Sequence, residues 1–269
     1  MNMADFLKSR KSTREFKKQN IKENDFKEVK KLLDKMNTEI EETEMTVGIY
    51  EYGKHISDSL RGIGGYAGVM IESPHYISID IKNHAAKALV ESGYYMEKLI
   101  TGINNLGLGS CWVTLNNIDD ERKRAIFGEN SGNIEYLLAI GYAKPKNPFS
   151  QESFSERKGV EEIIFIDKMN NIVSMDTLEE RGLGDLLFYI RFAPSTKNLQ
   201  SWRFIVHNNY VELFLEEIDG EYYYADAGIA MYYFEELAKR QGLNNKWEVE
   251  MKPELIDGVN YMYIGCYKF

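Results

Sequence analysis

Residues 93–112, GYYMEKLITGINNLGLGSCW, recur in a second version at residues 228–247, GIAMYYFEELAKRQGLNNKW. With one offset, a glycine, a methionine, a Gly-Leu pair and a tryptophan coincide between the two stretches. Each stretch is predicted to be a helix that ends at a glycine, because glycine most easily adopts the left-handed backbone that follows a helix. The chain therefore contains one structural unit twice.

The similarity extends beyond the two helices. The expected strand at 140–144, IGYAK, matches 264–268, IGCYK, and before the helices residues 76–78 run parallel to residues 204–206. The alternative is chance similarity between two helix–turn–strand segments, since glycines that end helices recur in many folds. Agreement of three elements in the same order favours duplication.

Hydrophobic periodicity predicts an α+β fold. Helices are expected at residues 2–9, 24–36, 83–106, 119–127, 178–191 and 226–240, and strands at 46–50, 76–81, 135–142, 163–166, 203–207, 211–215 and 260–268. With 269 residues, the chain is long enough for one large domain or two modest ones, each with a real core.

The net charge of −9 opposes a broad nucleic-acid or anionic-membrane surface, because phosphate repels such a protein. A local basic site for one small anion remains compatible with it. Cys111 and Cys266 form no Cys-x-x-Cys pair and are expected to be reduced and buried. The N-terminal sequence lacks the apolar run of a signal peptide and no later segment is apolar enough to span a bilayer, so we expect a cytoplasmic protein without membrane or nucleic-acid partners.

Several familiar sites are missing from the sequence. The four histidines make no metal-binding pattern, so no metal is expected, and there is neither a Gly-x-Ser-x-Gly elbow nor a Walker-type phosphate loop. The stretch RGIGGYAG at 61–68 lacks the strand before and the helix after that a dinucleotide-binding loop needs. A flexible surface or lid loop is the better interpretation.

Three polar segments can carry a site. Residues 10–14, RKSTR, combine cations and hydroxyls that can chelate a phosphate. Residues 193–202, APSTKNLQSW, place hydroxyls and amides in one loop, where they can bind the polar edge of a heterocycle. Residues 155–158, SERK, add a basic pair. In isolation, a solvated basic segment and ordinary turn chemistry are the better explanations of the first two.

Together, RKSTREF, APSTKNLQSW, GLGSCWV, IGYAKP and ERKGVEEIIF resemble the motifs of the FMN-dependent nitroreductase family. The resemblance runs from residue 6 to residue 268 and is greatest to the subgroup in which two nitroreductase-like halves are fused in one chain. It implies a tandem pseudo-dimer with central antiparallel sheets flanked by helices. The expected halves are residues 1–160, with the phosphate and flavin-N5 contacts, and residues 161–269, with the Pro-Ser loop.

The same resemblance implies FMN contacts for three groups of residues. The basic segments contact the phosphate and ribityl chain, the turn after Gly-Leu-Gly lies near flavin N5, and the Pro-Ser loop touches the ring and ribityl chain. The expected ligands are Arg10, Lys11, Ser12, Arg14, Arg157 with Lys158 beside it, Val113, Thr114, Leu115, Pro194, Ser195, Thr196, Asn198 and Gln200.

The chain also departs from the family pattern. Residues 57–73 occupy the place where the first half would carry a Pro-Ser loop, and Ser201 replaces the usual proline before Trp202. Thr114 and Leu115 stand where many members have glycines. Because the two halves keep complementary residues, we expect one FMN site per chain, at the interface of the halves, rather than two.

The expected activity is that of an NAD(P)H oxidoreductase that reduces nitro compounds, quinones or similar small acceptors through flavin N5. NADH or NADPH is the transient hydride donor, and no catalytic side chain is required because the flavin carries the chemistry. The alternatives are a narrower flavin reaction, such as dehalogenation or self-fragmentation, and a non-catalytic flavin-binding or degenerate protein of the same fold. An internal pseudo-dimer makes a monomer the expected state, with further dimerisation open.

Overall fold

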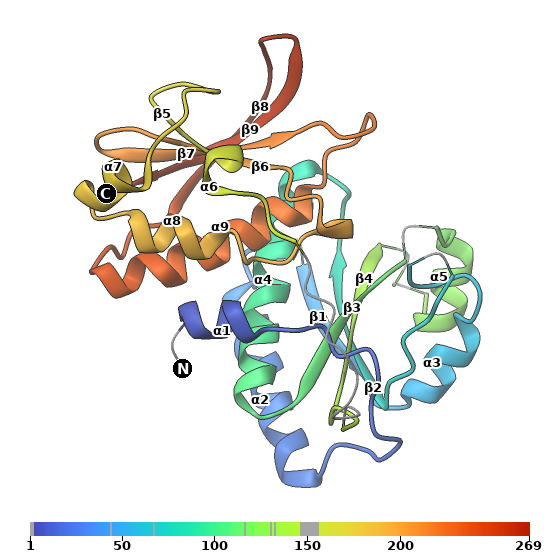
Figure 1. Ribbon diagram of the computed structural model, residues 1–269. Helices are drawn as coiled ribbons and strands as arrows, with labels where there is room; N and C mark the ends of the chain where they lie inside the picture. The colour runs from blue at the N-terminus through green and yellow to red at the C-terminus, as the bar shows by residue number, and fades with distance from the viewer. Residues whose placement is uncertain are drawn as a thin grey trace. The chain divides into compact units, whose positions relative to one another are not determined.

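The computed structural model describes residues 3–43, 45–66, 68–115, 117–129, 131, 133–145 and 156–269, except for the side chain of Ser9. The chain forms two compact units, each with its own sheet (Figure 1). The β5–β9 unit comprises residues 1–10, 89–94 and 152–269, and the β1–β4 unit comprises residues 11–88 and 95–151.

The β5–β9 unit has a five-stranded sheet of order β5-β6-β7-β9-β8, antiparallel except for the parallel pair of β5 and β6. Its strands are β5 (Ile164–Ile166), β6 (Trp202–Val206), β7 (Tyr210–Glu216), β8 (Trp247–Ile256) and β9 (Val259–Lys268). Its helices are α1 (Met3–Ser9), α6 (Val160–Ile163), α7 (Met175–Glu180), α8 (Gly184–Ile190), α9 (Tyr224–Ala238) and the 3-10 turns η1 (Thr196–Asn198) and η2 (Lys239–Gln241).

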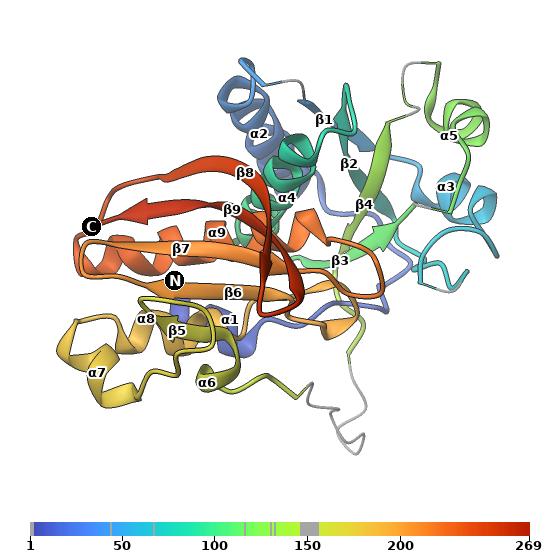
Figure 2. The same cartoon turned by 90° about the horizontal axis from the view of Figure 1, so that it is seen from above.

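Helix α9 is the centre of this unit because nearly all its side chains are buried. It packs against β6 and β7 on one side and against α1 and α8 on the other, so it lies between the sheet and a second helical layer (Figures 1 and 2). A helix that is apolar all round is expected in such a position. Aromatic contacts tie it to its neighbours, with Phe234 stacked on Phe204 of β6 and Tyr233 facing Phe6 of α1.

The two glycines that define the sequence repeat lie where α9 crosses residues 89–94 of α4 (Ala86–Asn105). A Cβ on Gly228 would overlap with the carbonyl oxygen of Val90, and a Cβ on Gly93 would overlap with that of Ala225. Val90 precedes Gly93 by the same three positions (93 − 90) by which Ala225 precedes Gly228 (228 − 225). The contact is therefore reciprocal, and only glycine permits the two backbones to approach so closely.

The β1–β4 unit has a four-stranded antiparallel sheet of order β1-β2-β4-β3. Its elements besides α4 are α2 (Glu23–Glu39), β1 (Met45–Tyr50), α3 (Gly53–Ser59), β2 (His75–Ile81), β3 (Gly109–Thr114), α5 (Asp120–Phe127) and β4 (Ile134–Gly141). A buried cluster that includes Leu60, Tyr76, Val113 and Leu137 forms its core. The glycine-rich segment 61–68 lies between α3 and β2 along the chain, so a helix precedes it and a strand follows it.

The two sheets share one strand order. The order β1-β2-β4-β3 corresponds to β6-β7-β9-β8, the five-stranded sheet without β5. In both sets a long helix follows the second of the four strands along the chain: α4 follows β2, and α9 follows β7. The expected match of residues 76–78 with 204–206 is therefore wrong, since β2 corresponds to β7 and β1 corresponds to β6. Two apolar strands side by side look alike in sequence, so only the pairing distinguishes them. By the same correspondence, a Pro-Ser loop of the first half would precede β1, whereas residues 57–73 lie between β1 and β2.

The expected α+β fold is confirmed, and most predicted elements are present within a few residues. The predicted helix 178–191 is wrong in one respect: it is broken into α7 and α8 at Gly182, whose φ is +73°. The amide groups of Gly182 and Leu183 close α7 by bonding the carbonyl oxygens of Glu179 and Leu178. Strand β8 was not predicted, because its polar residues and Pro253 suit an edge strand rather than an apolar core.

Cys111 and Cys266 are both free thiols, and of the two only Cys111 is fully buried. Within the described ranges, no helix combines the length and the apolar character needed to cross a bilayer.

Candidate functional site

The segment 193–201 connects α8 to β6 and has an unusual backbone. Lys197, Asn198 and Gln200 all have φ between +49° and +60°, a region that residues with a Cβ rarely adopt. Each such residue costs on the order of 1 kcal/mol or more, so surrounding contacts must hold the segment in place. We call residues 193–201 the amide loop.

Asp226, in the first turn of α9, holds one end of the amide loop. Its carboxylate accepts hydrogen bonds from the backbone N–H and the hydroxyl of Thr196, with donor–acceptor distances of 3.0 Å. Asp226 is 1% exposed, so a charged group that is nearly removed from water depends on these donors. The loop hydroxyl and the helix are thereby fixed to one another.

Arg157 holds the other end. Its Nη1 donates to the side-chain oxygen of Asn198 at 2.8 Å and to the carbonyl oxygen of Ala193 at 3.0 Å. Asn198 in turn donates to the carbonyl oxygen of Glu156 at 2.7 Å. The two predicted segments that contain Arg157 and Asn198 are thus in direct contact.

Three arginines converge beside this contact. Burial lowers the pKa of the Arg157 guanidinium, and the positive charges of Arg10 and Arg191 lower that pKa further. Arg191 Nε is shielded from solvent without a hydrogen-bond partner among the described residues. Two further positive charges beside a half-buried guanidinium disfavour its charged form, and a bound anion would favour it. The cluster of Arg10, Arg157 and Arg191 therefore has the charge of an anion site.

Lys158 and Gln200 extend the same network. The backbone N–H of Lys158 donates to the Gln200 side-chain oxygen at 3.1 Å, and the backbone N–H of Gln200 donates to the Ser195 hydroxyl at 3.1 Å. Burial lowers the pKa of the Lys158 ammonium, and the charge of Arg203 lowers it further. Arg203 itself is paired with Glu216. Pro194, which comes directly before Ser195, is half-buried.

The remaining basic residues of the N-terminal segment belong to the β1–β4 unit. Lys11 and Arg14 are exposed, and Ser12 is half-buried. The segment lies along the beginning of β3, because the N–H of Thr13 donates to the carbonyl oxygen of Ser110 at 2.8 Å. Arg10, by contrast, belongs to the β5–β9 unit with Arg157 and the amide loop.

The residues expected near flavin N5 form a strand rather than a turn. Val113 and Thr114 are the last residues of β3, and the side chains of Val113 and Leu115 are buried in the core. The N–H of Leu115 donates to the carbonyl oxygen of Glu135, and the carbonyl oxygen of Thr114 accepts from the N–H of Gly65. Thr114 keeps a half-buried side chain at this position, and the role of all three residues toward a flavin stays a prediction.

The chain matches the family model described as "Putative TM nitroreductase" over residues 2–238. This match covers most of the 269 residues. The chain belongs to this nitroreductase family.

The chain is also similar to solved structures, of which the first below shows the same fold. The crystal structure of "a putative nitroreductase" from Thermotoga maritima MSB8 aligns with a TM-score of 0.60 at 18% identity, over 98% of this chain and 94% of that chain. An FMN-dependent nitroreductase from Clostridium difficile R20291 aligns with a TM-score of 0.43 at 19% identity, over 53% and 88%. A nitroreductase family protein from Streptococcus pneumoniae TIGR4 aligns with a TM-score of 0.46 at 13% identity, over 60% and 98%. No curated protein matches the sequence.

Two residues of this candidate site were not predicted from the sequence. Arg191 lies two positions before the amide loop, where it looks like an ordinary basic residue at a helix end. Asp226 lies in the first turn of a helix, where acidic residues are common for electrostatic reasons alone. Neither position carries a sequence signal, because the role of each residue comes from a contact distant along the chain.

Proposed function

We propose that this protein is an FMN-dependent NAD(P)H oxidoreductase that reduces nitro compounds, quinones or similar small acceptors, with one FMN per chain. Membership in the nitroreductase family supports an oxidoreductase. The observation that carries the cofactor assignment is the convergence of Arg10, Arg157 and Arg191 on the amide loop.

The described residues fit FMN on chemical grounds. A phosphate monoester carries nearly two negative charges at neutral pH, which would offset the repulsion among the three arginines. Arg157 uses only Nη1 to hold the loop, and within the described residues the other donors of its guanidinium make no hydrogen bond. An arginine fork of this kind suits a phosphate group.

Within this proposal, Arg10 and Arg157 bind the phosphate, and Arg191 adds its charge. Pro194, Ser195, Thr196, Asn198 and Gln200 provide the surface for the ring and the ribityl chain. Lys11, Ser12, Arg14 and Val113–Leu115 remain further expected ligands from the family resemblance. When bound, FMN supplies the two-electron redox chemistry between the nicotinamide and the acceptor, and the protein binds and orients it.

We also propose that the chain is an internal pseudo-dimer with halves at residues 1–160 and 161–269, and that the FMN lies between these halves. Two observations support it. The sheets share the strand order, and the contacts of Gly93 and Gly228 are reciprocal, as in an interface with two-fold symmetry.

The purified protein tests the proposal directly. Flavin absorbance that persists through gel filtration, or that returns after incubation with FMN, is the expected result, followed by anaerobic bleaching with NADH or NADPH. Reoxidation by a nitroaromatic or a quinone then identifies the acceptor class. Protein that cannot take up FMN contradicts the cofactor assignment, whereas bound FMN that neither nicotinamide reduces contradicts the activity and leaves a flavin-binding protein.

A further inference from the structure

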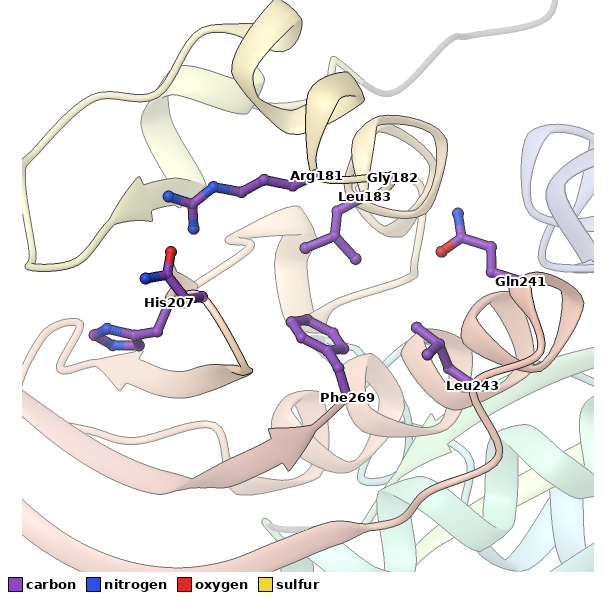
Figure 3. Close-up of a pocket in the computed structure, with 8 residues that line it drawn as sticks. Arg181, Gly182, Leu183, His207, Gln241, Leu243 and Phe269 are labelled. Carbon is purple, nitrogen blue, oxygen red and sulfur yellow. The ribbon is translucent and has the colours of Figure 1, made fainter.

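A cavity of about 460 Å³ lies in the β5–β9 unit, away from the amide loop. Four connections form its wall: the α7–α8 turn, the β6–β7 turn, the segment after α9, and the end of β9 (Figure 3). A volume of this size is in the range of small-molecule sites. None of the residues expected to bind FMN lines it.

Arg181 provides the charge of this cavity. Its side chain extends from the α7–α8 turn toward the β6–β7 turn (Figure 3). Nη1 is shielded from solvent and has no hydrogen-bond partner in the part of the chain that the structure describes. A buried donor without an acceptor costs on the order of 1–3 kcal/mol, so we expect a bound ligand to supply an acceptor to Nη1.

The rest of the wall is apolar or neutral. Leu183, Leu243 and Phe269 present hydrocarbon surface, and Gln241 presents an amide (Figure 3). Asn208 adds a second amide, and among the described residues that line the cavity none is an aspartate or a glutamate. A single cation above an apolar surface suits a ligand with one negative charge and a hydrophobic body.

His207 argues for a single charge on the ligand rather than two. Its Nε2 lies 2.9 Å from a carboxylate oxygen of Glu212, and its Nδ1 lies 3.9 Å from one of Asp167. These two carboxylates lie close to the imidazole and add negative potential, which disfavours a doubly charged phosphate. In Figure 3 the His207 ring, which is stacked on Tyr210, points away from Leu183 and Phe269, so it is not a second anion ligand in this arrangement.

We infer that this cavity, which we call the Arg181 site, binds a small organic carboxylate with an aromatic or aliphatic body. The carboxylate accepts from the Arg181 guanidinium, and the body packs on Leu183, Leu243 and Phe269. The site is independent of the proposed flavin site. Arg181 precedes α8 and the amide loop follows it, and seven helical residues span about 10 Å. On the other side, strand β6 lies between the amide loop and His207 along the chain.

The test uses the full chain and four probes: benzoate, its neutral isostere benzamide, acetate and inorganic phosphate. Binding is measured by isothermal titration calorimetry. We expect benzoate to bind at least about tenfold more tightly than benzamide, because a charge-assisted hydrogen bond is lost, and more tightly than acetate, because the apolar body is lost. If benzoate and benzamide bind equally well, the proposal of a carboxylate site is overturned. If phosphate binds more tightly than benzoate, the proposed class of ligand is wrong.

Two variants locate the binding. Arg181→Gln is expected to weaken benzoate binding about tenfold, and Arg122→Gln, at an exposed arginine of α5, is expected to leave it unchanged. Benzoate binding that Arg181→Gln leaves intact occurs elsewhere and overturns the proposal. If Arg181→Gln does not fold, Leu243→Ala replaces it, with a loss of benzoate affinity greater than any loss for acetate as the expected result. FMN retention is recorded for each variant and is expected to stay unchanged, so failure of the flavin assignment is seen separately.

Discussion

The two sheets of this protein have the same four-strand order but differ in the segments that join their strands. Before β6, the amide loop carries three left-handed residues and an arginine contact; before β1, α2 ends at Glu39 and β1 begins at Met45. Between β1 and β2 the chain makes a long excursion through α3, whereas β6 and β7 are joined by a short turn. Strand order and helix crossing maintain the fold, and the connections are free to acquire different functions.

The largest expected effect tests what the two halves share. Gly93→Ala and Gly228→Ala should each lower the free energy of unfolding by about 3 kcal/mol, because the new methyl group overlaps with the carbonyl oxygen of Ala225 or Val90. Urea denaturation measures both values. Gly48→Ala, in β1, is the control, since a Cβ there meets only Ser78 Oγ at 3.4 Å. A large loss for one glycine and none for the other would contradict the reciprocal contact.

The second prediction tests the difference in function. Arg10→Ala should weaken FMN binding about 10- to 100-fold, because it removes a cation from the cluster around Arg157. Arg181→Ala, at the opposite end of α8, should leave the FMN affinity nearly unchanged. Fluorescence titration of FMN into the apoprotein measures both constants. If the two variants bind FMN equally well, the FMN phosphate does not bind at Arg10.

The third prediction concerns the amide loop alone. Asp226→Ala should lower the free energy of unfolding by about 1–2 kcal/mol, because Thr196 loses the acceptor for its N–H and its hydroxyl. Asp226→Asn keeps an acceptor oxygen and should lose less. The offset that aligns Gly93 with Gly228 aligns Glu91 with Asp226 (228 − 93 = 226 − 91).

The segment before β1 is not an amide loop, so Glu91→Ala is expected to lower the free energy of unfolding less than Asp226→Ala does. Thermal or urea melts measure both values. Limited proteolysis adds a local measurement, in which Asp226→Ala should expose the loop to cleavage. Equal losses for the two acidic residues would mean that both have the same role.

The smallest effect concerns His75, the first residue of β2. Burial lowers the pKa of His75, whose Nε2 accepts from the N–H of Ile21 at 3.2 Å while Nδ1 lies 2.9 Å from the carbonyl oxygen of Glu51. With a folded pKa below the unfolded value of about 6.5, the unfolded chain binds the proton first as pH falls. His75 therefore contributes stability above pH 6.5 that is lost below it.

Urea midpoints at pH 7.5 and pH 5.5 measure this contribution. The unaltered protein should lose more stability over that interval than His75→Phe, which has no imidazole to protonate. If both proteins lose the same amount, other groups govern the acid sensitivity of this unit.

The sequence by itself determined most of the helices, the glycines that follow several of them, and the polar composition of the amide loop. These follow from periodicity and from the special backbone freedom of glycine, which are local properties. The motifs also indicated the family, and the match over residues 2–238 confirmed it.

Only the tertiary structure decided which strands correspond and which residues meet. Strand order distinguished β6 from β7, which look alike as apolar runs, and sheet pairing made β8 an edge strand despite its polar sequence. Arg157 meets Asn198, and Asp226 meets Thr196, through contacts between residues 41 and 30 positions apart. Left-handed residues other than glycine are unfavourable by local preference, so the backbone of the amide loop exists because these distant contacts outweigh that preference.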